Sequence, residues 1–474
     1  MPQFTTPIII GLEIHAELKT ATKLFCSCPT QGSDEPNTRT CPTCLGMPGS
    51  KPMLNKKAIE YGLKICLALK SDIAKQLIFS RKSYFYPDMS KNYQITQYEL
   101  PMGSGGVLSL EGGKGIRMKR VHLEEDPASL VHPGGMHESS YVLVDYNRSG
   151  NPLCEMVTEP DMQSPEEARD FLKQLITVLD YLGVFDVNSG IIKADANISI
   201  RESNYTRIEI KNITGFKEIE RALEYEIMRQ KNEISQGNTI SQETRSWDAD
   251  KGITLLMRKK ETEDDYGYII DTDLVPIVIE EKDISDLKSI MPELAKDKLK
   301  KFREQHGIEE TTANVLAKDK ELAAMYEAVA KEVSPQLAAN WVRRELSRVL
   351  NHSKKSLEDS GITAGHMISL LKLIDSKKIT EKTGQRLIEK LAESVFDVEE
   401  YVKKENLGTI QDSSLVEQWC REAIAENPGP VAQYKAGEEK AFNFLVGQVM
   451  RKAKGKAPPK DVNEVLRRLL SPID

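Results

Sequence analysis

Residues 12–18 read LEIHAEL, and apolar and polar side chains alternate through the whole stretch. Successive side chains of a β-strand point to opposite faces, so a period of two predicts a strand. Glu13, His15 and Glu17 would share one surface of this strand, and the apolar residues between them would pack behind it. The stretch therefore favours a half-buried strand whose polar face is available for chemistry.

Three further stretches show the same alternation. The polar members expected to share a face are His122, Glu124 and Asp126; Asp195, Asn197, Ser199 and Arg201; and Arg207, Glu209 and Lys211. Any single strand of this kind is equally well explained as the solvent face of a half-exposed sheet. Solvent faces usually carry Lys, Glu and Thr, whereas these four strands are rich in His, Asp, Asn and Arg. Together they predict a sheet face that holds a cation and a phosphate group.

Length and composition limit the class of protein. A chain of 474 residues exceeds the size of a single hydrophobic core, so we expect about two to four domains. The sequence has no run of 18 apolar residues and no signal peptide at its N-terminus, which predicts a cytoplasmic protein without a membrane segment. The net charge of -7 argues against extended coating of nucleic acid, but residues 451–474 carry seven Lys and Arg against three Asp and Glu.

Four of the seven cysteines are clustered in the sequence. Cys26 and Cys28 form one pair, Cys41 and Cys44 form another, and the twelve residues between the pairs are rich in turn formers. Two thiolate pairs on tight turns are the usual ligands of a structural zinc ion, so we predict a zinc knuckle. The alternative is a group of four buried thiols without metal. The remaining three cysteines lie among apolar residues and are expected in the core.

The pattern of helices and strands predicts an α+β fold. A helix is expected from Pro165 to Gly183 after a capping Ser164, and another from about Phe216 to Gly237. Sequence patterns typical of β-strands continue to Ile279, and the chain after Pro292 is expected to be helical. We therefore expect an N-terminal mixed-sheet catalytic domain with a zinc knuckle (1–295), an all-helical domain (296–407) and a small helical tail domain (408–474).

Two Gly-rich segments raise the question of a nucleotide-binding loop. Residues 112–115 read GGKG, but Leu108 stands where such a loop needs its first glycine, and Gly115 replaces the required hydroxyl. We interpret this segment as a hairpin turn, and residues 103–106 (GSGG) as a flexible connection. Any nucleotide would therefore be held by the sheet face and its metal.

Eight motifs in chain order resemble the B subunit of the glutamine-dependent aspartyl/glutamyl-tRNA amidotransferases, the GatB family. They are Gly11–His15, Arg81–Asp88, His122–Asp126, Glu155–Asp161, Asp195–Ser199, Glu209–Asn212, Gln242–Arg245 and Phe444–Met450. The similarity spans nearly the whole chain. An archaeal paralogue that acts only on Glu-tRNA(Gln) is longer by an inserted domain, for which 474 residues leave no room.

The resemblance implies an ATP-dependent carbon–nitrogen ligase (EC 6.3.5.-) with glutamine as amido donor. Such an enzyme converts misacylated Asp-tRNA(Asn) or Glu-tRNA(Gln) to the amide form through an acyl phosphate. The sequence does not say which tRNA is preferred. The alternative is a non-catalytic, zinc-stabilised tRNA-binding protein whose acidic face is structural.

The resemblance also implies site residues and cofactors. His15, Glu124 and Glu155 match magnesium ligands, although a histidine ligand leaves manganese open. Glu13, Glu125 and Asp195 match acidic neighbours that hold a second ion or orient water. The candidates for phosphate contact are Arg148, Arg201 and Lys211. For each acid, a salt bridge to a nearby Arg or Lys is the structural alternative.

We infer partner proteins from the resemblance and from the absence of an amidase signature in this sequence. The chain has no Ser-Ser-Lys amidase signature, so the family's amidase (A) and small (C) subunits would supply ammonia in a heterotrimer. A run of interleaved cations and rings suits the acceptor end of tRNA, with stacked core tyrosines as the alternative: Arg81, Lys82, Tyr84, Tyr86, Lys91, Tyr93 and Tyr98. The helical second half, with its tail domain and the basic residues 451–460, suits the tRNA body, with a solvated charge run as the alternative.

Two positions depart from the family pattern. Residues 265–268 read DYGY, so Gly267 stands where relatives have arginine, and Lys193 also replaces an arginine. These changes point to a divergent lineage or an altered substrate preference. The metal-binding positions are intact.

Overall fold

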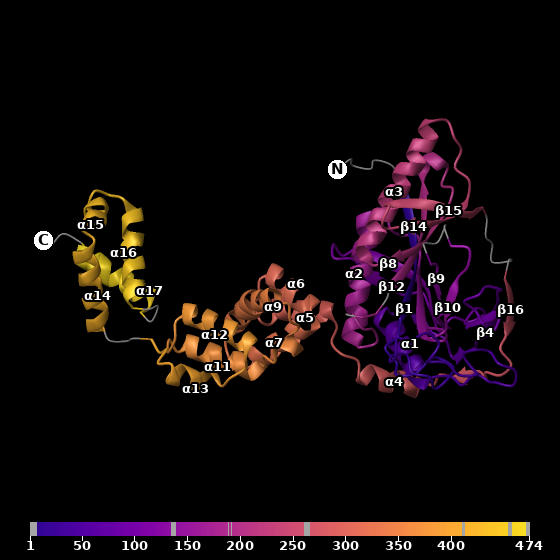
Figure 1. Cartoon of the computed structure of the whole chain (residues 1–474), viewed down its shortest axis with the longest axis horizontal. Helices are drawn as coiled ribbons and strands as arrows, with labels where there is room; N and C mark the ends of the chain where they lie inside the picture. Colours follow the sequence, from indigo (N-terminus) through magenta and orange to yellow (C-terminus); the bar gives the residue numbers. More distant parts are fainter. Residues whose placement is uncertain are drawn as a thin grey trace. The chain divides into compact units, whose positions relative to one another are not determined.

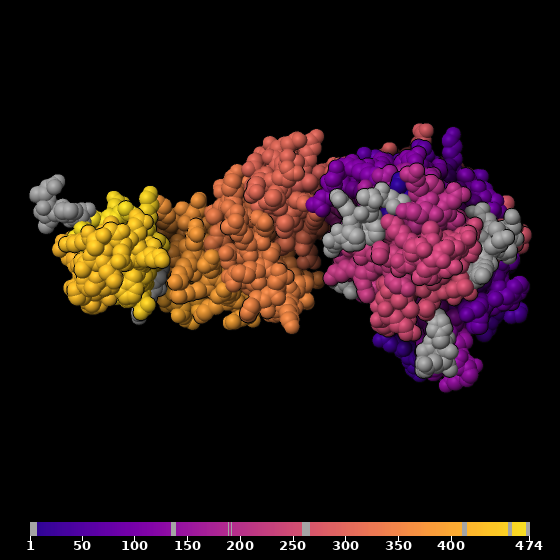
Figure 2. Space-filling model, turned by 90° about the horizontal axis from the view of Figure 1, so that it is seen from above, coloured from indigo at the N-terminus to yellow at the C-terminus, as the bar shows by residue number. Residues whose placement is uncertain are grey.

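The computed structural model describes residues 7–133, 139–187, 189–190, 192–259, 266–409, 413–453 and 457–470. The chain divides into two compact units, Met1–Leu294 and Ala295–Asp474. Figure 1 shows a sheet with helices in the first unit and helices in the second, and Figure 2 shows the surface of both. The predicted α+β class is confirmed. The predicted division of the helical region at residues 407 and 408 stays a prediction.

A long mixed sheet forms the centre of the N-terminal unit. Its order is β15 (Ile253–Lys259), β14 (Glu243–Asp248), β13 (Ile208–Thr214), β12 (Ile192–Ile200), β1 (Ile8–Glu17), β11 (Pro152–Thr158), β8 (Gly115–Glu125), β6 (Gly103–Ser104) and β2 (Asp72–Ile73). Strand β13 is parallel to β14, and the other neighbours in this order are antiparallel. Strand β1, which contains residues 12–17 of the LEIHAEL stretch, therefore lies in the interior of the sheet.

The four strands predicted from alternating polarity are β1, β8, β12 and β13. In β1 the apolar residues Leu12, Ile14 and Ala16 are at most 1% exposed and belong to the main hydrophobic core. The residues that alternate with them are half-buried on the other face. Period-two patterning thus separated the core face from the polar face correctly.

Three helices cover the apolar face of the sheet. They are α1 (Lys56–Ala68), α2 (Pro165–Leu182) and α3 (Phe216–Ser235), and α2 and α3 lie side by side (Figure 1). The predicted start and stop of α2 are confirmed, because Oγ of Ser164 accepts a hydrogen bond from the amide of Glu167 and Gly183 ends the helix with φ 67°. Glycine adopts this left-handed conformation without strain. The polar face of the sheet is left for other elements.

Short strands complete the N-terminal unit. Strands β4 (Ser80–Ser83), β5 (Tyr93–Thr96) and β16 (Gly267–Ile270) form a small sheet, β9 (Ser129–Val131) pairs with β10 (Leu143–Asp145), and β3 (Gln76–Leu77) pairs with β17 (Ile277–Val278). Strand β7 (Val107–Ser109) pairs with β8 as a hairpin, so the turn predicted at residues 112–115 is confirmed. Helix α4 (Glu281–Ser289) closes this unit.

The described residues from Ala295 onward form helices and connectors. These are α5 (Ala295–Glu304), α6 (Glu310–Lys318), α7 (Lys320–Val329), α8 (Pro335–Asn340), the π-helical turn η3 (Trp341–Leu346), α9 (Ser347–Ser353), α10 (Leu357–Ser360), α11 (Ala364–Asp375), α12 (Glu381–Glu393), α13 (Val398–Lys404), α14 (Ser413–Glu426), α15 (Pro428–Lys435), α16 (Glu439–Lys452) and α17 (Pro459–Leu470). Helices α14, α16 and α17 share a separate hydrophobic cluster that includes Leu445 and Leu466. Within the part of the chain that is described, no helix has both the length and the apolar character needed to cross a bilayer.

Candidate functional site

Strands β1, β8 and β11 bring three predicted ligands together. His15 of β1 lies opposite Glu155 of β11 in the strand register, and Glu124 comes from β8. Nε2 of His15 is 3.4 Å from Oε1 of Glu124 and 3.3 Å from Oε2 of Glu155. All three side chains can offer a ligand atom within 4.8 Å of the others. The donor set of one imidazole and two carboxylates suits a divalent cation.

Burial gives this cluster strong internal electrostatics. Glu124 and Glu155 are 7% and 8% exposed. Burial alone would lower the pKa of His15, but the hydrogen bond and charge of Glu155, followed by the charge of Glu124, raise it to about 10. Burial alone would raise the pKa of Glu155, but the neighbouring His122 and His15 hold it well below its usual value. In the metal-free chain a proton on His15 therefore partly balances the buried carboxylates.

His122 belongs to the same cluster. The alternation in residues 122–126 predicted that it shares the polar face of β8 with Glu124, but it did not indicate a role for the side chain. Its Nε2 is 3.3 Å from Oε2 of Glu155 and 3.8 Å from Oε2 of Glu124. Arg120 adds a guanidinium nitrogen 3.5 Å from the other oxygen of Glu155. A period-two reading back from Glu124 identifies both residues, but only the pairing of β8 with β11 shows that they approach Glu155.

A second group of charges lies on β1, β12 and β13. Nζ of Lys211 is 3.0 Å from Oδ2 of Asp195 and 2.7 Å from Oε1 of Glu209. Burial opposes the charge on Lys211, but Asp195 and Glu209 outweigh it and raise the pKa of the lysine. Glu13 faces Asp195 in the strand register, and burial followed by the charge of Glu155 raises the pKa of Glu13. An ammonium group thus stands among carboxylates beside the histidine cluster.

Both groups open into one cavity of about 350 Å³. Arg148 and Lys193 also line it, and Nε of Arg148 is 2.8 Å from Oδ2 of Asp126. Burial raises the pKa of Asp126 to about 7, although Arg148 and Lys193 act in the opposite direction. The cavity therefore combines carboxylates and an imidazole with four cationic side chains: Lys82, Arg148, Lys193 and Lys211.

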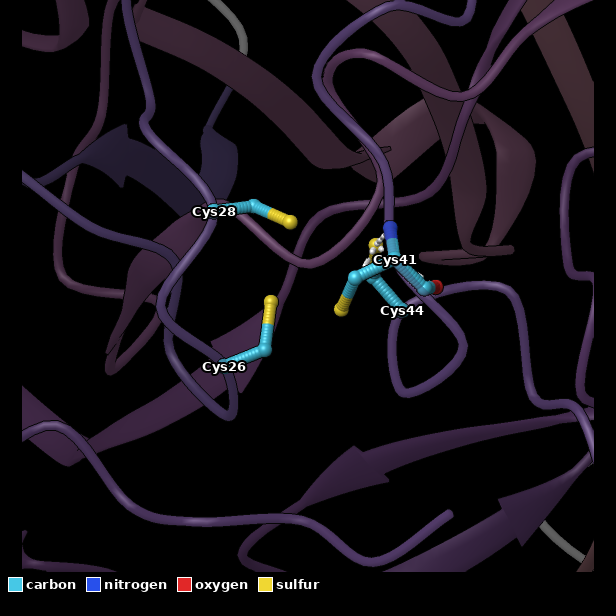
Figure 3. Close-up of side chains that lie close together, drawn as sticks. All are labelled: Cys26, Cys28, Cys41 and Cys44. Carbon is cyan, nitrogen blue, oxygen red and sulfur yellow. Dashed lines mark hydrogen bonds between the residues drawn. The ribbon is translucent and has the colours of Figure 1, made fainter.

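The four clustered cysteines converge as the sequence predicts. Figure 3 shows the sulfurs of Cys26 and Cys28 turned toward those of Cys41 and Cys44. The four Sγ atoms all lie within 4.8 Å of one another, and Sγ of Cys41 and Sγ of Cys44 are 3.9 Å apart. Zinc with bonds of about 2.3 Å places its four sulfurs about 3.8 Å apart, so the spacing fits tetrahedral zinc. The hydrogen bond from Cys26, aided by the charge of Lys23, lowers the pKa of Cys44 to about 5, which favours a thiolate ligand.

Comparisons with known proteins point to one family along nearly the whole chain. Residues 8–285 match the family model described as the GatB/GatE catalytic domain, and residues 324–470 match the one described as the GatB domain. The chain belongs to the GatB family. Three relatives, each named as the B subunit of an aspartyl/glutamyl-tRNA(Asn/Gln) amidotransferase, are 43% identical in Carboxydothermus hydrogenoformans, 42% in Haloquadratum walsbyi and 41% in Thermotoga maritima. The aligned regions cover 98% of this chain and 97% to 99% of each relative.

Two of the predicted site residues lie apart from the others, Glu125 from the resemblance and Arg201 from strand alternation. Glu125 occupies the opposite face of β8 from Glu124, where Nζ of Lys91 lies 2.5 Å and 2.6 Å from its two carboxylate oxygens. The pair is buried, so its geometry is that of a structural ion pair. This corrects the grouping of Glu125 with the cavity acids, because adjacent residues of a strand point to opposite faces.

Arg201 is the second correction. Its exposed side chain begins the turn η1 (Arg201–Ser203), just beyond the end of β12. It lies six positions after Asp195, which corresponds to about 20 Å along a strand. Strand alternation predicted a shared face, but the strand ends before Arg201, so the residue is not placed for phosphate contact in the cavity.

The run of interleaved cations and aromatic rings between Arg81 and Tyr98 has two roles in this GatB-family chain. Lys82 and Tyr84 line the cavity with Tyr266, and Nζ of Lys82 lies 4.6 Å from the centroid of the Tyr266 ring. Arg81 instead binds Asp271 through its Nε at 2.8 Å. The rings of Tyr98 and Tyr268 stack at 3.8 Å between centroids. Part of the run therefore borders the site, and part is structural.

Proposed function

We propose that this chain is the part of a tRNA-dependent amidotransferase that activates and amidates the side chain of a misacylated aminoacyl-tRNA. Membership of the GatB family and the names of its full-length relatives support the reaction class. The observation that carries the catalytic proposal is the convergence of His15, Glu124 and Glu155 in an open cavity that also holds cationic side chains. The proposed substrates are Asp-tRNA(Asn) and Glu-tRNA(Gln).

The proposed chemistry has two steps. An oxygen of the side-chain carboxylate attacks the γ-phosphorus of ATP, which forms an acyl phosphate and releases ADP. Ammonia then attacks the acyl carbon, the carbon–oxygen bond to phosphate breaks, and the nitrogen loses a proton to give the amide. Activation is required because a carboxylate anion is a poor electrophile toward ammonia.

The residues of the cavity suit these steps. His15, Glu124 and Glu155 would hold Mg²⁺ or Mn²⁺, which when bound neutralises charge on the phosphates during transfer. Arg148 and Lys211 line the same cavity and are assigned to the phosphate oxygens, since guanidinium and ammonium groups make charge-assisted hydrogen bonds to phosphate. His122 and Arg120 hold the Glu155 carboxylate in place. Glu13 and Asp195 are assigned to orient Lys211 and water.

The tRNA and the other proteins of the complex occupy different surfaces in this proposal. Lys82, Tyr84 and Tyr266 border the cavity and suit an unstacked base with its phosphate. The helical C-terminal unit binds the tRNA body. The amidase (A) subunit supplies ammonia from glutamine, and the small (C) subunit completes a cytoplasmic heterotrimer. The zinc ion of the cysteine cluster is structural, because its four thiolate ligands leave no open position.

Two variants in a reconstituted complex test the proposal. With glutamine, ATP and each misacylated tRNA, Glu124→Ala and His15→Ala should each lower amide formation by about a hundredfold or more, because loss of even outer metal partners lowers activity by about 10- to 100-fold. Binding of tRNA should stay unchanged. Comparison of the two tRNAs also determines substrate preference.

The control is Arg201→Ala, which changes a charged residue just past the end of β12 and outside the cavity. It should retain wild-type amide formation. If the wild-type complex consumes no ATP while it still binds tRNA, the chain is a zinc-stabilised tRNA-binding protein and the catalytic proposal is wrong.

A further inference from the structure

The loop between the two cysteine pairs contacts the segment that carries Arg148 into the cavity. This loop, residues 29–40, is closed at both ends by the cysteines of the zinc knuckle. Its partner is the segment from Leu143 to Arg148, which includes strand β10. The two are more than a hundred residues apart in the sequence, so the contact exists only in the folded chain.

Asn37 makes three hydrogen bonds to this segment. Its amide donates to Oδ1 of Asp145 at 2.9 Å, and its Nδ2 donates to the carbonyl of Val144 at 3.1 Å. In return, the amide of Tyr146 donates to Oδ1 of Asn37 at 2.8 Å. Asn37 has a φ of 60°, a left-handed conformation that asparagine tolerates better than most residues. Its backbone and side chain together pair with the segment as a short strand would.

Two further bonds continue the contact toward Arg148. The amide of Arg39 donates to Oδ1 of Asn147 at 2.7 Å, and Nδ2 of Asn147 donates to the carbonyl of Glu35 at 2.7 Å. Asn147 is 2% exposed. The residue directly before Arg148 is therefore fixed to the loop from both sides.

Lys23 links the segment to a cysteine directly. Its side chain is fully buried, and Nζ lies 3.8 Å from Sγ of Cys44 and 3.2 Å from the carbonyl oxygen of Tyr146. An ammonium group buried in this way needs negative charge or hydrogen-bond acceptors close by. Cys44, as a thiolate ligand of zinc, would supply the charge, and the Tyr146 carbonyl supplies the acceptor. Lys23 thus joins the metal site to the residue two positions before Arg148.

The far end of the segment reaches the cavity. Nε of Arg148 lies 2.8 Å from Oδ2 of Asp126 and 3.3 Å from the carbonyl oxygen of Pro127. The carbonyl of Arg148 accepts a hydrogen bond from the amide of Asn151, whose Nδ2 donates to Oε1 of Glu17 at 2.7 Å. Both Glu17 and Arg148 line the cavity.

We propose that the zinc-knuckle loop positions Arg148 in the cavity, with Asn37 and Lys23 as the positioning residues. The knuckle then acts beyond its own stability, because it fixes the backbone from which a phosphate-binding guanidinium extends. The task of Arg148 rests on the proposed function. The coupling of the loop to the Leu143–Arg148 segment does not, and it can be measured without catalysis.

Asn37→Gly tests the coupling in the full chain within the reconstituted complex. Glycine keeps the left-handed backbone without strain and removes only the side-chain bonds to Val144 and Tyr146. The matched control is Asn204→Gly, another exposed asparagine with left-handed backbone (φ 54°), in the turn after β12. Zinc content, hydrogen exchange of residues 143–149, and the KM for ATP are measured for both variants and for Arg148→Ala.

We expect Asn37→Gly to retain wild-type zinc content and to exchange the amides of residues 143–149 about tenfold faster, because two hydrogen bonds of about 1 kcal/mol or less each are lost. Amide formation or the KM for ATP should worsen about tenfold, in the range of lost positioning contacts. Asn37→Gly should add little in the Arg148→Ala background, because the two changes act through one group. Asn204→Gly should match the wild type.

Three results would contradict parts of this picture. Unchanged exchange at residues 143–149 overturns the positioning role, whatever the activity. Loss of zinc from Asn37→Gly overturns it as well, since Asn37 would then act on the metal site. If the wild-type complex consumes no ATP while exchange still rises, the coupling stands and the proposed function fails.

Discussion

The two candidate metal sites of the N-terminal unit are built in opposite ways. The cysteine cluster takes its ligands from Cys26 to Cys44, a single short segment of the chain. The acid–histidine cluster takes His15, Glu124 and Glu155 from three neighbouring strands, spread over more than a hundred residues. The first has four sulfur donors, and the second opens into a cavity of about 350 Å³.

This difference indicates a structural role for the cysteine cluster and a chemical role for the acid–histidine cluster. Four thiolates complete the tetrahedral shell of zinc and leave no place for a substrate. One imidazole and two carboxylates leave positions of a magnesium or manganese ion free for phosphate and water. We therefore expect damage to the local, closed site to appear as lost stability, and damage to the distributed, open site to appear as lost activity.

The largest effect should come from removal of the zinc ion that we propose for the cysteine cluster. Structural zinc contributes about 10 to 16 kcal/mol in isolated zinc-finger peptides. Part of that should be lost here, so Cys44→Ser should lower the unfolding temperature by about 10 °C. Calorimetry of the full chain measures it, with zinc content determined in parallel. Cys420→Ala, a buried cysteine of the C-terminal unit, is the control and should keep its zinc.

Neighbouring glutamates on β8 provide the sharpest comparison of stability with activity. Glu125→Ala leaves Lys91 buried without its partner, and breaking a buried pair costs about 3 to 5 kcal/mol. Glu124→Gln keeps the shape of its side chain, so the unfolding temperature should stay within a few degrees while amide formation falls about a hundredfold. Chemical denaturation and amidation assays measure the two effects. Equal behaviour of both variants would remove the distinction between the faces of the strand.

The pH dependence of the metal-free chain should follow the histidine cluster. Glu155 and Glu124 raise the pKa of His15 from 6.5 to about 10. Its protonation stabilises the folded chain fully below pH 6.5, and this contribution is lost as the pH rises through about 10. In buffer without magnesium or manganese, the unfolding temperature should fall between about pH 7 and 10, by about 2 to 4 °C for each kcal/mol lost. His15→Gln, which does not titrate, should show a smaller fall over the same range.

The smallest effect is expected at Arg201. Because its side chain is exposed beyond the end of β12, Arg201→Ala should change stability by less than about 0.5 kcal/mol and leave amide formation near the wild-type rate. Lys211→Ala removes an ammonium group from among Asp195, Glu209 and Glu13, and should lower amide formation at least about tenfold. A strong defect in Arg201→Ala would show that the site extends past the end of the strand.

Much of the fold could be predicted because its signals are local. The alternation in residues 12–18 gave the core face of β1, and Ser164 with Gly183 gave the bounds of α2. The cysteine pairs indicated their own site for the same reason. Glu125 was misplaced because the resemblance carried its role without regard to strand faces, and Arg201 was misplaced because the alternation was extended past the end of β12.

By itself the sequence determined which side chains share a face, since the alternation of a strand is fixed by backbone geometry. It also determined which cysteines lie together, because a short loop constrains them. Only the tertiary structure decided which strands and loops are neighbours. It therefore also decided that His122 lies beside Glu155 and that Asn37 binds the segment before Arg148. Strand order and register depend on the packing of the whole core, to which no short stretch of sequence corresponds.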